Sequence, residues 1–339
     1  MWWVMSSVSL KPLNEQVMVI TGASSGIGLA TAREAAHRGA KVVLASRNEQ
    51  ALSQIVSELK SEGLEAIHVV ADVSNRDDLE LIAERAIDNF GCFDTWVNNA
   101  AVSIYGKLEE VDEEDHRRLF EVNFWGMVNG SLVALRHLKQ HGGALINLGS
   151  VASDLAIPLQ GMYSASKHAV KAFTDALRME LQEENAPVSV TLIKPTSINT
   201  PFPQHAKNYM EEEPKLPPPV YPPEEVARAI CYAAAHPKRD IYIGSAAKLM
   251  SASSKIAPRT TDRINQKVFT KEQKSDQPAR HYEGSLYAPG DDGSMHGNLH
   301  GSFARSSSVY TRASLHPFLT GAMIITGGIG LITALEKKR

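Results

Sequence analysis

The chain has 339 residues, of which 43% are hydrophobic and 22% charged, and its formal net charge is -3. This length suits one large α/β domain with an appendage and excludes three ordinary domains. The near-neutral charge gives no reason to expect a nucleic acid as partner. Cys92 and Cys231 lie far apart with no histidine cluster nearby, so neither a disulfide scaffold nor a metal site is expected. The N-terminus has no basic segment followed by a sustained apolar run, so we expect no signal peptide and a cytoplasmic catalytic domain.

Short β-branched runs alternate with stretches of helical period between Val17 and Gly244, which is the pattern of βαβ units. We predict strands at residues 17–21, 41–46, 66–70, 95–98, 144–148, 189–194 and 240–243, with helices between them. The first strand is continuously apolar, so both faces of the sheet are expected to be buried. The predicted fold is therefore α/β: a doubly wound, Rossmann-type parallel seven-stranded sheet with helices on both faces. A ligand crevice is expected at the carboxyl ends of the strands.

A short helix at residues 245–256 closes the predicted nucleotide-binding domain, which spans 15–256. Residues 271–317 are rich in Ser, Gly, Pro, His and charge, which predicts a flexible linker. Residues 318–335 then form an uncharged, largely apolar run, at the short end of what spans a bilayer. Small residues every four positions along this tail would let a second transmembrane helix pack against it. We predict membrane association through the tail. A buried core or oligomer-contact helix, or a shallow or re-entrant placement, are the alternatives.

A glycine-rich turn directly follows the first predicted strand and precedes a helix. It reads Thr21-Gly22-Ala23-Ser24-Ser25-Gly26-Ile27-Gly28. Glycines let the backbone turn tightly and approach a pyrophosphate, which N–H groups and the positive end of the helix dipole would hold. The alternative is a glycine-rich turn that binds no ligand. The expected contacts of the pyrophosphate are Gly22, Ser24, Ser25, Gly26, Ile27 and Gly28.

The end of the second predicted strand reads Leu44-Ala45-Ser46-Arg47, where a carboxylate would hold the ribose hydroxyls of NAD. No carboxylate is present, and a guanidinium pairs well with a 2′-phosphate, so Arg47 favours NADP over NAD. The alternative is that Arg47 is a solvated surface charge. Asp72 and Val73 end the third strand, where the carboxylate would accept from the adenine amino group or cap a helix.

Tyr163 and Lys167 are four residues apart in a run of helical period, so both project from one helix face. A tyrosine hydroxyl is a poor acid-base group at neutral pH, and the Lys167 ammonium and a cationic nicotinamide would stabilise its phenolate. Ser150 follows the predicted strand at 144–148, where its hydroxyl would hydrogen-bond a reacting oxygen. A Tyr-x-x-x-Lys pair alone is weak support, because such pairs occur by chance on many helices.

Together these residues resemble the short-chain dehydrogenase/reductase family over roughly residues 15–244. The family's glycine loop, its Asn-Asn-Ala segment and its Ser, Tyr and Lys fall in matching order on the loop at 21–28, Asn98-Asn99-Ala100, Ser150, Tyr163 and Lys167. By the same resemblance, Asn123 would complete a tetrad by holding a proton-relay water near Lys167, and Thr200 would contact the nicotinamide amide. A buried asparagine satisfied by the backbone is the alternative for Asn123. Ala101 and Thr196 stand where the family usually has glycine, which puts fine geometry in doubt but removes no reacting group.

The resemblance implies hydride transfer between nicotinamide and an alcohol or carbonyl carbon. Tyr163 would donate or accept the proton, Ser150 would orient the substrate oxygen, and Lys167 would also bind the nicotinamide ribose. It further implies a homo-oligomer. A membrane-tethered NADP-binding sensor or scaffold with little turnover is the alternative function, but a mere binder has no need of Tyr163. The sequence does not name the substrate.

The proline-rich segment at residues 201–223 lies where relatives cover the substrate. It carries four large apolar or aromatic side chains, which would either line an apolar pocket or pack the loop onto the domain. They are Phe202, Tyr209, Met210 and Leu216.

Overall fold

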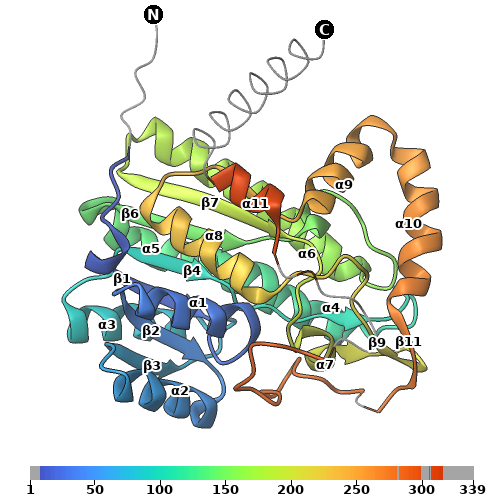
Figure 1. Ribbon diagram of the computed structural model, residues 1–339, viewed down its shortest axis with the longest axis horizontal. Coiled ribbons are helices and arrows are strands. Elements are labelled where there is room, and N and C mark those ends of the chain that lie inside the picture. Colours follow the sequence, from blue (N-terminus) through green and yellow to red (C-terminus); the bar gives the residue numbers. More distant parts are fainter. Residues whose placement is uncertain (1–7, 281, 299–304, 306, 316–339) are drawn as a thin grey trace, which may run out of the picture.

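A central parallel sheet organises the computed structural model, which describes residues 8–280, 282–298, 305 and 307–315 (Figure 1). The sheet order is β10-β7-β6-β4-β1-β2-β3, and all neighbouring strands are parallel. The strands are β1 (Val17–Thr21), β2 (Lys41–Ser46), β3 (Ala66–Val70), β4 (Thr95–Asn98), β6 (Gly143–Leu148), β7 (Val188–Pro195) and β10 (Asp240–Ile243). The predicted doubly wound fold is confirmed, and each predicted strand ends within one residue of the observed one.

Helices cover both faces of the sheet, because successive side chains along a buried strand point to opposite faces. In β1, Val17 and Val19 join one core cluster, while Met18 and Ile20 join the other. The cluster around Met18 takes its helical residues from α1 (Gly26–His37), α2 (Glu49–Ser61) and α8 (Pro223–Ala235). The cluster around Val17 takes its own from α3 (Arg76–Phe90), α4 (Glu113–Phe120), α5 (Gly126–His141) and α6 (Gly161–Glu183). Only the carboxyl edge of the sheet is thereby left for a ligand.

Short elements gather along that carboxyl edge. In a small second sheet, β5 (Ile104–Tyr105) pairs in parallel with β8 (Lys207–Asn208). The remaining short helices of the first 210 residues are η1 (Leu13–Glu15), η2 (Glu121–Trp125, a π-helical turn), η3 (Val151–Ser153) and α7 (Phe202–His205). Of these, η3 and α7 flank the sheet edge on which the predicted catalytic residues lie.

The chain beyond β10 departs from the predicted linker. The short helix α9 (Ser245–Ile256) is found where it was predicted, but it is followed by a second helix, α10 (Pro258–Glu272). Next, β11 (Lys274–Pro278) pairs antiparallel with β9 (Glu212–Pro214), and α11 (Val309–Leu315) lies farther on. Over its described residues, the segment 271–317 is packed through a few apolar side chains and many main-chain hydrogen bonds. Neither kind of contact requires a regular spacing of apolar residues, so the sequence shows no hydrophobic periodicity there.

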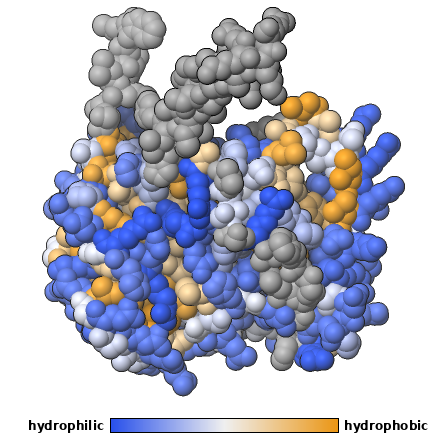
Figure 2. Space-filling model, viewed as in Figure 1, coloured by the Kyte–Doolittle hydropathy of each residue, from blue (hydrophilic) through white to orange (hydrophobic). Residues whose placement is uncertain are grey.

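Apolar side chains are exposed on α9 and α10, as Figure 2 shows in orange on the side of the molecule where these helices lie. They include Leu249 and Ile256 on α9 and Ile264 and Val268 on α10. Within the described part of the chain, no helix combines the length and apolar character needed to cross a membrane. The predicted hydrophobic tail at 318–335 lies outside the described residues.

Candidate active site

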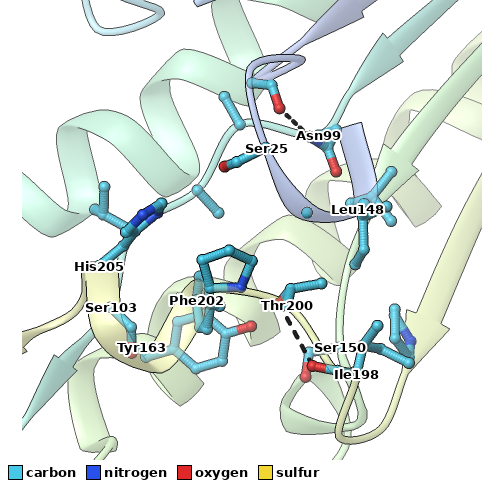
Figure 3. A pocket seen from close by; sticks show the side chains of 18 of the residues that line it. Ser25, Asn99, Ser103, Leu148, Ser150, Tyr163, Ile198, Thr200, Phe202 and His205 are labelled. Atoms are coloured by element: carbon cyan, nitrogen blue, oxygen red, sulfur yellow. Dashed lines mark hydrogen bonds between the residues drawn. The ribbon is translucent and has the colours of Figure 1, made fainter. Parts of the chain in front are cut away.

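A cavity runs along the carboxyl edge of the sheet and brings together most of the predicted site residues (Figure 3). The predicted residues that line it are Gly22, Ser24, Ser25, Gly26, Ile27, Arg47, Asp72, Val73, Asn99, Ala100, Ser150, Tyr163, Lys167 and Thr200. Gly28, Asn98 and Asn123 do not line it. In Figure 3, Ser25 and Asn99 lie on one side of this cavity, while Tyr163, Ser150 and Thr200 lie on the other.

The glycine loop between β1 and α1 is shaped in a way that a side chain would prevent. Gly22 has a φ of +65°, and a Cβ there would lie 2.8 Å from the Ala100 Cα. A Cβ on Gly28 would lie 2.0 Å from the Gly22 carbonyl oxygen. Gly28 therefore has to be a glycine for the loop to close. The loop then presents the start of α1 to the cavity, as a bound pyrophosphate requires.

Asn98 is the last residue of β4 and Asn99 the first of the next loop, and their side chains hydrogen-bond different parts of the protein. The Asn99 side chain donates to the carbonyl oxygens of Thr21 (2.9 Å) and Gly22 (3.0 Å) and so fastens the glycine loop. Asn98 is buried, and its amide nitrogen donates to Ser131 on α5 (3.0 Å) and Asn147 on β6 (2.9 Å). These hydrogen bonds direct the Asn98 side chain into the core. The predicted cofactor contact of Asn98 stays a prediction.

Ser150, Tyr163 and Lys167 converge on the cavity from two elements. Ser150 precedes η3, and its hydroxyl accepts from the Ala152 N–H (3.1 Å). Tyr163 and Lys167 lie one turn apart near the start of α6, with the Lys167 Nζ 5.7 Å from the centroid of the Tyr163 ring. The Lys167 Nζ donates to the Leu148 carbonyl oxygen (2.8 Å) at the end of β6, which holds it beside the cavity.

Burial favours the neutral forms of both titratable groups. It raises the pKa of Tyr163 to about 12, although a hydrogen bond with Ser150 works in the opposite direction. It lowers the pKa of Lys167 from 10.5 to about 8. The net pKa shift of Tyr163 in the protein alone is therefore set by its removal from water, and the effect that opposes it comes from Ser150. Tyr163 therefore carries its proton at neutral pH.

Asn123 lies in the π-helical turn η2, between α4 and α5, and is buried. Its amide pairs with both backbone groups of Val102: Oδ1 accepts from the N–H (2.8 Å) and Nδ2 donates to the carbonyl oxygen (2.9 Å). A further bond runs from Nδ2 to the hydroxyl of Ser166, the neighbour of Lys167 (3.3 Å). The side chain thus matches the alternative of a buried asparagine satisfied by the backbone, and it joins the loop after β4 to α6.

Arg47, directly after β2, is half-buried and its guanidinium has hydrogen-bond partners within the protein. Its guanidinium donates to the carbonyl oxygens of Ser285 (2.5 Å), Ala288 (3.2 Å) and Leu286 (3.4 Å). Burial lowers its pKa, an effect that the Asp72 carboxylate opposes. These partners come from the segment that the sequence suggested was a linker.

Asp72 lies near the start of the turn between β3 and α3, and its side chain is a charged carboxylate. Burial works against that charge, but hydrogen bonds from Ser74 and Arg118 outweigh it and lower the pKa of Asp72. Arg118 Nη2 lies 2.6 Å from the carboxylate. The Asp72 side chain lines the cavity and accepts hydrogen bonds from Ser74 within the turn. The predicted alternative of a helix-capping Asp72 is wrong, because Asn75 caps α3.

The substrate end of the cavity includes residues that sequence reasoning missed. These are Tyr105, Gln160, His205, Met250 and Phe269. Met250 and Phe269 come from α9 and α10, and no motif marked either helix as part of a site. Of the four residues predicted in the proline-rich segment, Phe202 and Leu216 line the cavity.

Phe202 also packs on Tyr163, with ring centroids 5.7 Å apart. Tyr209 and Met210 take the predicted alternative and pack the loop onto the domain. The Tyr209 hydroxyl donates to Asp115 (2.6 Å), and Met210 is buried.

The chain is similar in sequence to known proteins. Residues 16–211 match the family described as short chain dehydrogenase. The uncharacterized oxidoreductase YxnA of Bacillus subtilis (strain 168) is 46% identical over 340 residues, which cover 99% of this chain and 94% of that protein. The 11-beta-hydroxysteroid dehydrogenase A of Sesamum indicum is 36% identical over 191 residues, covering 56% of this chain and 54% of its own.

Two solved structures are similar as well. The alcohol dehydrogenase of Thermococcus sibiricus, complexed with 5-hydroxy-NADP, covers 67% of this chain and 95% of its own, with 30% identity and a TM-score of 0.59. A short chain dehydrogenase/reductase of Burkholderia phymatum, in complex with NAD, covers 78% of this chain and 98% of its own, with 28% identity and a TM-score of 0.62. The chain therefore belongs to the short chain dehydrogenase family and is an oxidoreductase with a nucleotide-binding Rossmann fold.

Proposed function

We propose that the protein is an NADP(H)-dependent oxidoreductase that interconverts an alcohol and a carbonyl compound, with Tyr163 as the acid-base group. The observation that carries this proposal is the convergence of Ser150, Tyr163 and Lys167 on a cavity that begins at the glycine loop. A protein that only bound a nucleotide would not need a buried, protonated tyrosine beside a serine hydroxyl.

The residues along the cavity fit a nicotinamide dinucleotide, which when bound supplies or accepts the hydride. The start of α1 would hold the pyrophosphate, because backbone N–H groups and the positive end of the helix dipole meet there. Asp72 would accept from the adenine amino group. At the other end, Thr200 would contact the nicotinamide amide, and Lys167 would bind the neighbouring ribose.

The proposal of NADP rests on Arg47. No carboxylate ends β2 to hold a ribose 2′-hydroxyl, and the Arg47 guanidinium is the cation that lies at that place in the cavity. A 2′-phosphate would accept a charge-assisted hydrogen bond from it. NAD would leave the cation without such a partner.

The protonation of Tyr163 favours carbonyl reduction. A phenol with a pKa of about 12 is able to donate its proton to the oxygen that becomes an alcohol. The Ser150 hydroxyl would hold that oxygen in place. Lys167, in its charged form, would then stabilise the phenolate left behind.

The test is a panel of carbonyl compounds with NADPH, and of the matching alcohols with NADP⁺, followed through the absorbance of the reduced nicotinamide. The panel should include apolar ketones, since Phe202, Met250 and Phe269 line the substrate end. We expect NADPH-dependent reduction of at least one of them. Turnover with NADH alone across the whole panel would contradict the cofactor assignment.

Three further expectations stay predictions: a cytoplasmic catalytic domain, a homo-oligomer and membrane association through residues 318–335. Deletion of residues 318–339 should release the protein from membranes. A shortened protein that still fractionates with membranes would contradict an anchor in the tail.

A further inference from the structure

A stretch of the C-terminal region, residues 285–294, lies across the cofactor end of the cavity; we call it the strap. It follows β11 and is part of the orange chain that runs past α7 in Figure 1. The Gly293 N–H donates to the Ser24 carbonyl oxygen (2.9 Å), and the Ser294 carbonyl oxygen accepts from the Gly26 N–H (2.9 Å). The strap therefore uses a donor at the start of α1, which is the kind of group that a pyrophosphate oxygen would use.

The strap also accepts hydrogen bonds from the Arg47 guanidinium. Both protons of Arg47 Nη2 are directed at strap carbonyl oxygens, those of Ser285 and Ala288. Nη1 donates to a third, on Leu286. A phosphate that binds two guanidinium nitrogens at once needs a proton of Nη2. With both Nη2 protons bonded to the strap, the phosphate could not form the bidentate pair that makes such contacts strong.

An acidic side chain of the strap would also oppose the binding of a 2′-phosphate. Asp292 lines the cavity and acts electrostatically on Arg47. A carboxylate at that place would repel the 2′-phosphate of NADP, whereas it is compatible with the 2′-hydroxyl of NAD. The adjacent Asp291 is exposed and does not line the cavity.

We propose that the strap competes with the dinucleotide for its phosphate-binding groups, Gly26 and Arg47, and that NADP(H) displaces it from both while NAD(H) displaces it from Gly26 alone. The proposal rests on the proposed use of NADP(H). A phosphate is the stronger acceptor, because hydrogen bonds between charged groups are roughly twice as strong as neutral ones. The 2′-phosphate therefore opens the strap, and cofactor binding is coupled to its movement.

The strap is held by contacts that can be loosened one at a time. The Leu286 side chain is fully buried, and the Tyr287 hydroxyl donates to the Asp115 carboxylate (2.8 Å). The Asp291 carbonyl oxygen lies 2.9 Å from the His205 Nε2. Asp115 keeps partners in Tyr209 and Lys207 when Tyr287 is changed. The substitution Tyr287→Phe thus weakens the strap without leaving a bare buried charge.

Hydrogen exchange on the wild-type protein tests the displacement directly. Saturating NADP⁺ should speed amide exchange in residues 285–294, and above all at Gly293, whose N–H is bonded to Ser24 in the closed form. NAD⁺ should speed it less. Slower exchange with NADP⁺ would show that the strap closes on the cofactor, and would overturn the proposal.

Binding constants test the competition. Tyr287→Phe should lower the Kd for NADPH by about two- to tenfold, the worth of one hydrogen bond, with a smaller gain for NADH. Tyr282→Phe, a change at an exposed tyrosine three residues before the strap, is the matched control and should leave both constants unchanged. A higher Kd for NADPH in Tyr287→Phe would contradict the proposal.

Substitution of two adjacent aspartates tests the role of charge in the strap. Asp292→Asn should tighten NADPH more than NADH, whereas Asp291→Asn, with the same loss of charge, should not. Equal effects of the two would overturn the role of Asp292. Failure of the wild type and of every variant to bind NADPH in these titrations would instead refute the proposed function, so the two failures are distinct.

Discussion

Tyr163 and Lys167 are one turn apart on α6, yet the same removal from water shifts their pKa values in opposite directions, to about 12 and about 8. Both shifts favour the uncharged form. The lysine stays mostly charged at pH 7 and loses its charge close to physiological pH, while the tyrosine keeps its proton throughout. The pH dependence of catalysis should therefore follow Lys167.

The kcat/KM for NADPH, which reports groups of the free enzyme, should be level below pH 7 and fall as the pH rises through about 8. The sign follows from the lowered pKa: Lys167 is charged below that value and neutral above it. A neutral amine cannot stabilise the phenolate formed when Tyr163 gives up its proton. Lys171→Met, one turn farther along α6, should keep the profile. A level profile up to pH 10 in the wild type would contradict this role.

Substitution of Arg47 should change the Kd for NADPH and the Kd for NADH by different amounts. Arg47→Ala should raise the Kd for NADPH by about 10- to 100-fold, because it removes a charge-assisted hydrogen bond. NADH should be unaffected or bind more tightly, since the change also frees the strap. Titration by the fluorescence of the reduced nicotinamide measures both constants. Equal losses for NADPH and NADH would refute the assignment of Arg47.

At the scale of elements, the βαβ pattern was sufficient to locate the sheet. Buried parallel strands are continuous apolar runs, so their ends are sharp in the sequence, and the glycine loop and Ser150 follow from those ends. The strap and α10 were not predicted. The strap is bonded to Arg47 through main-chain carbonyl oxygens, and carbonyls carry no signature in the sequence. On α10, Phe269 packs on a small apolar cluster, and one such residue gives no recognisable period.

The turn that carries Ser150 is fixed by a buried ion pair. Lys194 on β7 and Asp154, directly after η3, lie 3.2 Å apart and are 2% and 1% exposed. Ser251 on α9 and Tyr242 on β10 also hydrogen-bond the carboxylate (2.8 Å and 3.1 Å). This cluster joins η3 to α9, so it links the turn that bears Ser150 to the helix that covers the substrate end.

Lys194→Met should therefore lower the free energy of unfolding by about 3–5 kcal/mol, because it leaves a buried carboxylate without its cation. Lys171→Met, which breaks a partly exposed pair with Asp175, should cost less than about 1 kcal/mol. Urea denaturation measures both. The double change Lys194→Met with Asp154→Asn should recover part of the loss, and no recovery would argue against a charge-based cause.

At the scale of the whole molecule, the fold and the family are established, and the substrate is the part the sequence could not name. The proposed catalytic residues lie on or directly after elements that the βαβ pattern predicts. The walls of the substrate end come from α7, α9 and α10, which arrive from distant parts of the chain. Phe202, Met250 and Phe269 from these helices line the cavity, so we expect their arrangement to influence which substrate fits.

The most direct test of the account is Tyr163→Phe, measured with a carbonyl substrate identified in the panel. Turnover should fall by about 10²- to 10⁴-fold, the usual contribution of a general acid, while the Kd for NADPH stays within about twofold of the wild type. Tyr282→Phe should change neither value. Turnover that survives in Tyr163→Phe within tenfold of the wild type would contradict the central claim that Tyr163 transfers the proton.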